Sequence, residues 1–153
     1  MKAWRISKKR YAKNALDGEG AYRYGGRWNS RGVRVVYLSS SPALAALEVL
    51  VNADAQLLLA VPYVAIVVEF DESLVTRPER LPKNWRDDPP PKSAARIGDD
   101  WVVSAASLLL EVPSAVIPFE RNYLLNPAHP AMGSLRIGKP QAFSFDPRLL
   151  RPT

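Results

Sequence analysis

VVYLSSSPALAALEVLV, residues 35–51, joins a strand signal directly to a helix signal. The β-branched residues at its start predict a strand over 33–38. Three serines follow as candidate N-caps, and Pro42 suits the first position of a helix. Apolar side chains then recur at helical spacing, at Leu44, Leu47 and Val51. The stretch therefore predicts a helix over 43–51 with one apolar face.

Glu48 is the polar exception in this helix, four residues after Leu44 and close to one edge of the apolar face. Burying an unpaired carboxylate is costly, so a glutamate in this position needs a charged or hydrogen-bonding partner. A glutamate that reaches water, or pairs with a nearby arginine, is the simpler interpretation. A functional carboxylate is the alternative.

The rest of the chain contains short strand signals separated by loops, without a 20–50-residue repeat. Further strands are expected at 3–6, 63–70, 112–117 and 141–145. A second helix is expected at 101–110 after Asp99 and Asp100, and 122–130 is rich in turn residues. Five prolines make 78–92 a surface loop, exposed at 85–92. The pattern predicts one compact α+β domain over 1–153, with mixed or antiparallel strands and a few helices.

Positive charge is concentrated at the start of the chain. The 153 residues include 21 Lys and Arg against 15 Asp and Glu. Residues 1–34 hold 10 basic and 2 acidic residues, a local net charge of +8. Aromatic residues are interleaved there, so the segment suits a polyanion or a phosphorylated small molecule. A solvated basic surface is the alternative.

Several chemistries are excluded by composition. The chain has no Cys, so it has no disulfide, thiolate nucleophile or iron–sulfur cluster. His129 is the single histidine, which excludes a His-rich metal centre, and we expect no metal. No apolar run approaches 18 residues, and no secretory signal is apparent. We therefore expect a cytoplasmic protein without membrane contact.

Four further residues are candidates for a site. Arg27 lies in the glycine-bearing turn 25–29, where it could grip a phosphate or simply be exposed. Tyr37 could stack on a flat base or pack in the core. Ser114 and Arg5 are polar side chains in apolar strands, and each needs a hydrogen-bonding partner.

Together, three blocks of sequence resemble the RES domain family. The blocks are GGRWN at 25–29, VVYLSSSPALAALEVLV at 35–51 and VPSAVIPFERNYLLNPAHP at 112–130. The family is named for an Arg, a Glu and a Ser. Matching the blocks places these residues at Arg27, Glu48 and Ser114.

The resemblance implies an ADP-ribosyltransferase-like fold and the toxin of a bacterial toxin–antitoxin pair. Such a toxin is an enzyme that cleaves the nicotinamide–ribose bond of NAD+, which is its substrate. It thereby depletes NAD+ or passes ADP-ribose to water, phosphate or a protein. The implied partner is an Xre-like helix-turn-helix antitoxin, so this chain alone is not expected to bind DNA. Both a homo-oligomer and a toxin–antitoxin hetero-oligomer stay open.

The resemblance also implies roles for residues. Glu48, Arg27 and Tyr37 would be catalytic, with Glu48 stabilising positive charge on the ribose. The residues expected to bind NAD+ are Arg5, Arg27, Tyr37, Ser114 and Asn122. Two other functions stay open: a basic toxin that binds RNA or another nucleic acid, and a non-catalytic interaction module.

Overall fold

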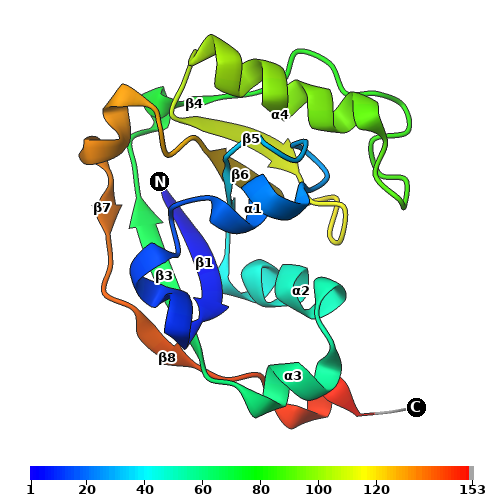
Figure 1. Cartoon of the computed structure of the whole chain (residues 1–153), viewed down its shortest axis with the longest axis vertical. Coiled ribbons are helices and arrows are strands. Elements are labelled where there is room, and N and C mark those ends of the chain that lie inside the picture. Colours follow the sequence, from blue (N-terminus) through cyan, green and yellow to red (C-terminus); the bar gives the residue numbers. More distant parts are fainter. Residues whose placement is uncertain (152–153) are drawn as a thin grey trace.

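A single curved sheet organises the molecule (Figure 1). The structure is a computed structural model and describes residues 1–151. Eight strands follow the order β4-β5-β6-β2-β1-β3-β7, with β8 also paired to β3. Their bounds are β1 (Lys2–Lys8), β2 (Val36–Ser39), β3 (Tyr63–Glu69), β4 (Val75–Thr76), β5 (Leu109–Pro113), β6 (Arg121–Leu125), β7 (Arg136–Ile137) and β8 (Gln141–Phe143). Only the β4–β5 pair is parallel among the described strands.

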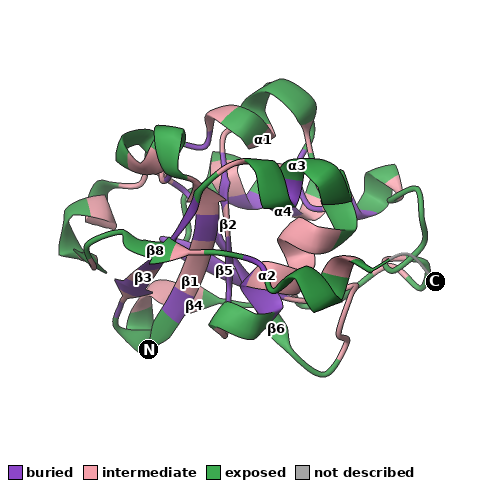
Figure 2. Cartoon of the chain, turned by 90° about the horizontal axis from the view of Figure 1, so that it is seen from below, coloured by how far each residue is buried: buried purple, intermediate pink, exposed green. Residues whose placement is uncertain are grey.

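Helices cover the sheet and leave its strands at the centre, as the burial colours of Figure 2 show. The α-helices are α1 (Glu19–Tyr24), α2 (Pro42–Asn52), α3 (Ala55–Ala60) and α4 (Lys92–Ser104). Short 3₁₀ helices span Lys9–Asn14, Glu72–Leu74, Pro130–Ser134 and Pro147–Leu150. One domain of mixed helices and mostly antiparallel strands confirms the predicted α+β class. None of the helices described in residues 1–151 is both long and apolar enough to span a membrane.

Helix α2 begins where the sequence predicted. The Ser41 hydroxyl accepts a hydrogen bond from the Leu44 N–H at 3.1 Å, and Pro42 follows the cap. The predicted apolar face is only partly right, because Leu44 is buried whereas Val51 is 58% exposed. The helix instead packs through Ala45 and its neighbours against β1 and β3. The packed face of the helix is thus rotated from the predicted one, and Glu48 lies at its edge.

Helix α4 begins earlier than the predicted 101–110 helix and ends at Ser104, so the second half of that prediction is wrong and Leu109 and Leu110 belong to strand β5. It starts at Lys92, directly after Pro91, so Asp99 and Asp100 lie in its second half. Gly98 lies inside this helix, and its missing side chain has a packing role. A Cβ at this position would overlap the carbonyl oxygen of Trp28. Contact with the 25–29 turn therefore overrides local propensity here.

The predicted turn-rich stretch 122–130 instead begins with a strand. Strand β6 pairs with β2 on one side and β5 on the other, and both ladders run antiparallel. These long-range pairs supply the stability that local propensity lacks. Conversely, the predicted 112–117 strand ends at Pro113, and a loop over 114–120 leads to β6.

Candidate functional site

Glu48 reaches from α2 to the turn between β5 and β6. Its Oε1 accepts hydrogen bonds from the Ser114 hydroxyl at 2.8 Å and from the Asn122 amide at 2.6 Å. Both donors are buried, with exposed fractions of 0% and 8%. Among the described residues, Glu48 Oε2 has no hydrogen-bonding partner. The carboxylate is thus held by one oxygen and presents the other.

Ser114 is fixed from two sides. Its hydroxyl donates to Glu48 and accepts hydrogen bonds from the N–H groups of Val116 and Ile117, at 3.1 and 3.0 Å. The Ser114 N–H also donates to the Glu120 carbonyl at 3.0 Å, which closes the turn. Backbone geometry therefore determines where this donor meets the carboxylate.

Tyr37, on β2, is fixed by the glycine-bearing turn at 25–29. Its hydroxyl donates to Asn29 Oδ1 at 2.6 Å and accepts from the Trp28 N–H at 3.1 Å. A Cβ on Gly26 would lie 2.5 Å from this hydroxyl, so glycine permits the close approach. Burial raises the pKa of Tyr37 well above its usual range, with smaller contributions from the nearby carboxylates of Asp99 and Glu48. The phenol therefore stays protonated.

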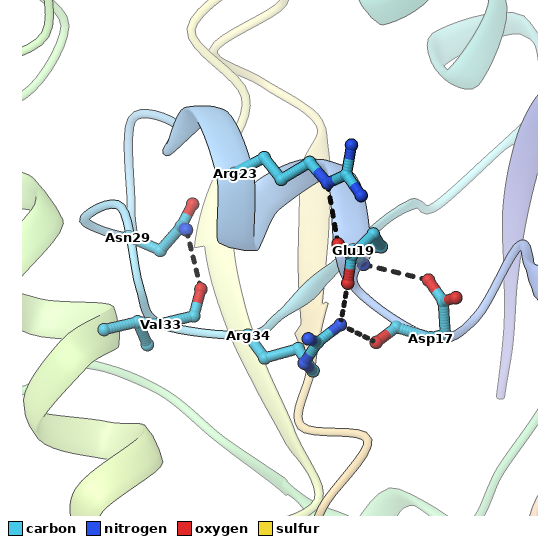
Figure 3. Close-up of polar contacts among 6 residues, drawn as sticks. All are labelled: Asp17, Glu19, Arg23, Asn29, Val33 and Arg34. Atoms are coloured by element: carbon cyan, nitrogen blue, oxygen red, sulfur yellow. Dashed lines mark hydrogen bonds and ion pairs between the residues drawn. The ribbon is translucent and has the colours of Figure 1, made fainter.

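The segment that leads into this turn is held by a polar network (Figure 3). Glu19 accepts from Arg23 Nε at 2.7 Å and pairs with Arg34 at 2.6 Å. These contacts lower the pKa of Glu19. Asn29 Nδ2 donates to the Val33 carbonyl at 3.0 Å, so the segment after the turn is tied to its last residue. The network places the turn against Tyr37.

Arg27 contacts the Pro-rich loop. Its NH1 donates to the carbonyl oxygens of Trp85 and Asp87, each at 2.7 Å, and Trp85 stacks on Trp28 with ring centroids 6.0 Å apart. From the same loop, Arg86 Nε donates to the carbonyl of Ala115 at 3.0 Å. The loop therefore spans from the Arg27 turn to the residue after Ser114.

Arg5 lies where β1 and β2 part. These strands share one residue pair, Trp4 with Ser39, and Arg5 NH1 donates to the Tyr37 carbonyl at 3.3 Å. Its buried Nε has no hydrogen-bonding partner among the described residues. Burial lowers the pKa of Arg5, and the charge of Asp17 acts in the opposite direction.

Two open grooves lie elsewhere on the molecule. One, of about 610 Å³, is lined by Lys9, Arg10, Lys13 and residues of β3 and β8. The other, of about 440 Å³, lies between α3 and the segment around β8. Neither is lined by Glu48, Tyr37 or Arg27. No cluster of three or more potential metal ligands of the His, Cys, Asp or Glu type occurs in residues 1–151.

The structure thus brings three predicted residues into direct contact: Glu48, Ser114 and Asn122. Arg27 lies close enough to Tyr37 for its charge to act on the pKa of the phenol, whereas the side chain of Arg5 hydrogen-bonds only to the Tyr37 carbonyl within residues 1–151. The sequence did not indicate the site contacts of Ser39, Asn29 and Trp85. Ser39 could be interpreted only as a candidate cap, because its partner Asn122 is 83 residues away.

This arrangement suits the stabilisation of positive charge. A carboxylate fixed through one oxygen needs no reorganisation when a cation forms beside the other oxygen. Adjacent N–H and O–H donors keep that carboxylate oriented. Arg27 lies near enough for its charge to act on the pKa of Tyr37, and as a cation it suits an anionic group of a ligand.

Comparison with known proteins identifies the family. The RES domain model matches residues 2–146. The chain belongs to the RES domain family. This confirms the resemblance drawn from the three sequence blocks.

The relatives of this RES-domain chain are named as toxins. Toxin Res of Yersinia enterocolitica (serotype O:8, biotype 1B) is 42% identical over 151 residues, with 97% of this chain and 99% of the relative aligned. The Prs ADP-ribosylating toxin of Sphingobium sp. (strain YBL2) is 38% identical over 154 residues, with 97% and 96% aligned.

A solved structure has the same fold. A chain in the crystal structure of the M. tuberculosis MbcT–MbcA toxin–antitoxin complex superposes with a TM-score of 0.74 at 19% identity. The match covers 97% of this chain and 86% of that one. The RES-domain chain therefore has the fold found in that complex.

Proposed function

We propose that this chain is the toxin of a bacterial toxin–antitoxin pair and that it cleaves the nicotinamide–ribose bond of NAD+. The observation that carries the proposal is Glu48, held through Oε1 by Ser114 and Asn122 with Oε2 free of protein partners in the described chain. Family membership and relatives named as toxins support it. The name of the Sphingobium relative supports ADP-ribose chemistry.

Glu48 would act on the sugar. As the bond from ribose C1′ to the nicotinamide nitrogen breaks, its electron pair leaves with nicotinamide and positive charge builds on C1′ and the ring oxygen. A carboxylate oxygen nearby stabilises that charge, as carboxylates do in glycoside hydrolysis. An acceptor then attacks C1′ and loses its proton.

The neighbouring residues would hold the rest of NAD+. Tyr37 would present its ring to nicotinamide, and Arg27 would hold pyrophosphate through the guanidinium N–H groups not used by the loop carbonyls. Arg5, Ser114 and Asn122 remain predicted NAD+ contacts. For the last two, the bond to Glu48 supports a role behind the carboxylate.

The acceptor and the partner complete the proposal. Water, inorganic phosphate and a protein side chain are the three candidate acceptors. The Sphingobium relative's name, ADP-ribosylating toxin, supports a protein acceptor. An antitoxin partner is supported by the toxin–antitoxin complex that shares the fold, and we expect it to be of the Xre-like helix-turn-helix type, acting in the cytoplasm.

Purified protein incubated with NAD+ tests the proposal through nicotinamide release. Glu48→Gln keeps the size of the side chain but removes its charge, so we expect turnover to fall at least about 100-fold. Glu72→Gln, on an exposed 3₁₀ turn, is the control. Product analysis with and without phosphate and candidate proteins identifies the acceptor. Folded wild-type protein that releases no nicotinamide with any acceptor would contradict the proposal and favour an interaction module.

Nucleic-acid binding is a second candidate function, favoured by one groove. Lys9, Arg10 and Lys13 line it, and none of them pairs with a carboxylate in the described chain. Three phosphate contacts would make affinity for single-stranded RNA fall about 20-fold between about 50 and 200 mM salt. Replacing all three residues with Glu should abolish that binding. Equal RNA affinity in the triple variant would exclude the groove.

A further inference from the structure

A buried hydrogen bond lies behind the Glu48 carboxylate, on the side away from the free oxygen. The Ser39 hydroxyl donates to Asn122 Oδ1 at 2.8 Å, and Asn122 Nδ2 donates to Glu48 Oε1 at 2.6 Å. Ser39 is 5% exposed and Asn122 is 8% exposed. The chain of contacts therefore runs from β2 through β6 to α2, and it is buried up to the half-buried Glu48.

The direction of these bonds determines how the Asn122 amide is oriented. An asparagine side chain has one acceptor oxygen and one donor nitrogen, and a rotation of about 180° exchanges them. The exchanged orientation would place the amide oxygen against Glu48 Oε1, where two acceptors repel. The carboxylate can only accept, so it selects the orientation in which the NH2 group faces it, whereas a hydroxyl can donate or accept. With the amide oxygen on its side, the Ser39 hydroxyl donates to that oxygen and holds the amide in this orientation with a second hydrogen bond.

The sheet register holds this arrangement in place. Ser39 and Asn122 are directly paired residues in the antiparallel β2–β6 ladder, so their side chains lie on the same face. Tyr37 precedes Ser39 by two residues and shares that face. The Ser40 N–H donates to the Arg121 carbonyl at 3.0 Å, which extends the pairing by one bond. The backbone pairing of the two strands therefore sets the distance between the Ser39 hydroxyl and the Asn122 amide.

Ser39 is not needed to cap α2, because Ser41 performs that role. Its hydroxyl also has no other hydrogen-bonding partner in the described chain. A valine or alanine would satisfy the apolar surroundings of β2 equally well. The hydroxyl is thus explained by what it does to Asn122.

We propose that Ser39 is a positioning residue, which orients the Asn122 amide so that Asn122 and Ser114 together fix Glu48 for reaction. The proposal rests on the proposed cleavage of NAD+ by this site. Ser39 acts through Asn122 and does not touch substrate. Its effect should therefore fall mainly on kcat, because Tyr37, Arg27 and Arg5 would still bind the substrate, whereas the barrier depends on carboxylate placement.

Steady-state kinetics of nicotinamide release test this role with three variants. Ser39→Ala should lower kcat about threefold to tenfold, the effect of one hydrogen bond, with KM within about twofold. Ser39→Thr retains the hydroxyl and should restore most of kcat. Ser40→Ala is the matched control, because Ser40 is adjacent and its side chain makes no hydrogen bond in the described chain. A Ser39→Ala enzyme with unchanged kcat would overturn the proposal.

Side-chain amide NMR of Asn122 gives a readout that does not depend on turnover. In the wild type, one NH2 proton bonds to the carboxylate, so the two proton signals should be well separated. In Ser39→Ala the separation should narrow as the amide gains rotational freedom, while Ser40→Ala leaves it unchanged. Unchanged Asn122 signals in Ser39→Ala would overturn the positioning role. If the wild type cleaves no NAD+, the proposed function fails, and this NMR comparison alone decides whether Ser39 orients the amide.

Discussion

The two oxygens of the Glu48 carboxylate have different surroundings. Oε1 accepts from Ser114 and Asn122, whereas Oε2 has no protein donor in residues 1–151. Each charge-assisted bond from a buried donor restricts rotation of the carboxylate. A carboxylate that served only to stabilise the fold would gain most from donors on both oxygens. The asymmetry leaves Oε2 available to a bound molecule, as the proposed function needs.

Tyr37 makes the stability of the protein sensitive to alkaline pH. Its pKa is raised in the folded state, so the stabilisation is fully present below the unfolded pKa of about 10 and is lost as pH rises toward the folded value. In that window an unfolding chain releases a proton that the folded chain retains. Each such group lowers the free energy of unfolding by about 1.4 kcal/mol per pH unit. Tyr63 and Tyr123, whose pKa values burial also raises, act in the same direction.

Tyr37→Phe should therefore weaken the alkaline pH dependence of the free energy of unfolding, because one proton fewer is released on unfolding. Denaturant titrations from pH 9 upward would measure the slope. At neutral pH the variant should lose about 1–3 kcal/mol, because Asn29 Oδ1 and the Trp28 N–H lose their partner. Equal alkaline slopes in the variant and the wild type would show that Tyr37 does not titrate differently on folding.

Single residues could be chosen as candidates from the sequence where local pattern and chemistry agreed. Glu48 stood out because a charge interrupts an apolar helix, and Arg27 because it lies in a glycine-bearing turn. The partners of Arg27 in the Pro-rich loop, the carbonyls of Trp85 and Asp87, lie 58 or more residues away, so no spacing in the sequence could reveal them. The contact between Ser39 and Asn122 was hidden for the same reason, because 83 residues separate the two.

At the scale of helices and strands, prediction depended on whether the residues that start or end an element lie beside it in the sequence. Helix α2 carries its own cap and proline, and its predicted start was right. Helix α4 lacks a side-chain cap, and its interior contains Gly98 and two aspartates. Its stability comes from Ala94 and Trp101, which pack with Leu124 and Trp28. Packing of this kind is not visible in a helical pattern.

Gly98→Ala should destabilise the protein although alanine is the better helix former. In an open helix the change gains about 1 kcal/mol. Here the added methyl group would overlap the Trp28 carbonyl and approach Leu124, and overpacking typically costs about 1–3 kcal/mol or more. We expect a melting temperature lower by several degrees in thermal unfolding.

Gly20→Ala is the matched control for this prediction. Gly20 lies in α1, and nothing is within 4 Å of the Cβ it would gain. That variant should be more stable than the wild type by up to about 1 kcal/mol. If both variants were stabilised, the contact between α4 and the 25–29 turn would not be as close as the structure has it.

At the scale of the whole molecule, most of the basic residues of 1–34 fall into three groups with different surroundings. Among the ten basic residues of 1–34, Lys2, Arg23 and Arg34 form ion pairs with carboxylates. Arg5 and Arg27 instead bind backbone carbonyls around Tyr37 and the Pro-rich loop. Lys9, Arg10 and Lys13 remain on the separate groove. The net charge of the segment therefore does not belong to one surface, and a count of charges alone could not have located the site.

The sheet itself parts beside the site. Strands β1 and β3 are paired over seven positions and β2 and β6 over four, but β1 and β2 meet only at Trp4 and Ser39. Backbone N–H groups along this seam have few partners, so they should exchange hydrogen with solvent faster than those between β1 and β3. The seam borders Tyr37 and Arg5, which were predicted to bind NAD+.

NAD+ should therefore slow hydrogen exchange at this seam. Glu48→Gln protein, which we expect to bind NAD+ without consuming it, allows exchange to be measured by mass spectrometry at equilibrium. Peptides that contain 4–6, 36–39 and 114–122 should gain protection, because a ligand there excludes water and restricts opening. Peptides from the groove at 9–13 serve as the internal control and should not change. Protection confined to that groove, with none at the seam, would place the dinucleotide on the basic surface and would contradict the assignment of Glu48 to its cleavage.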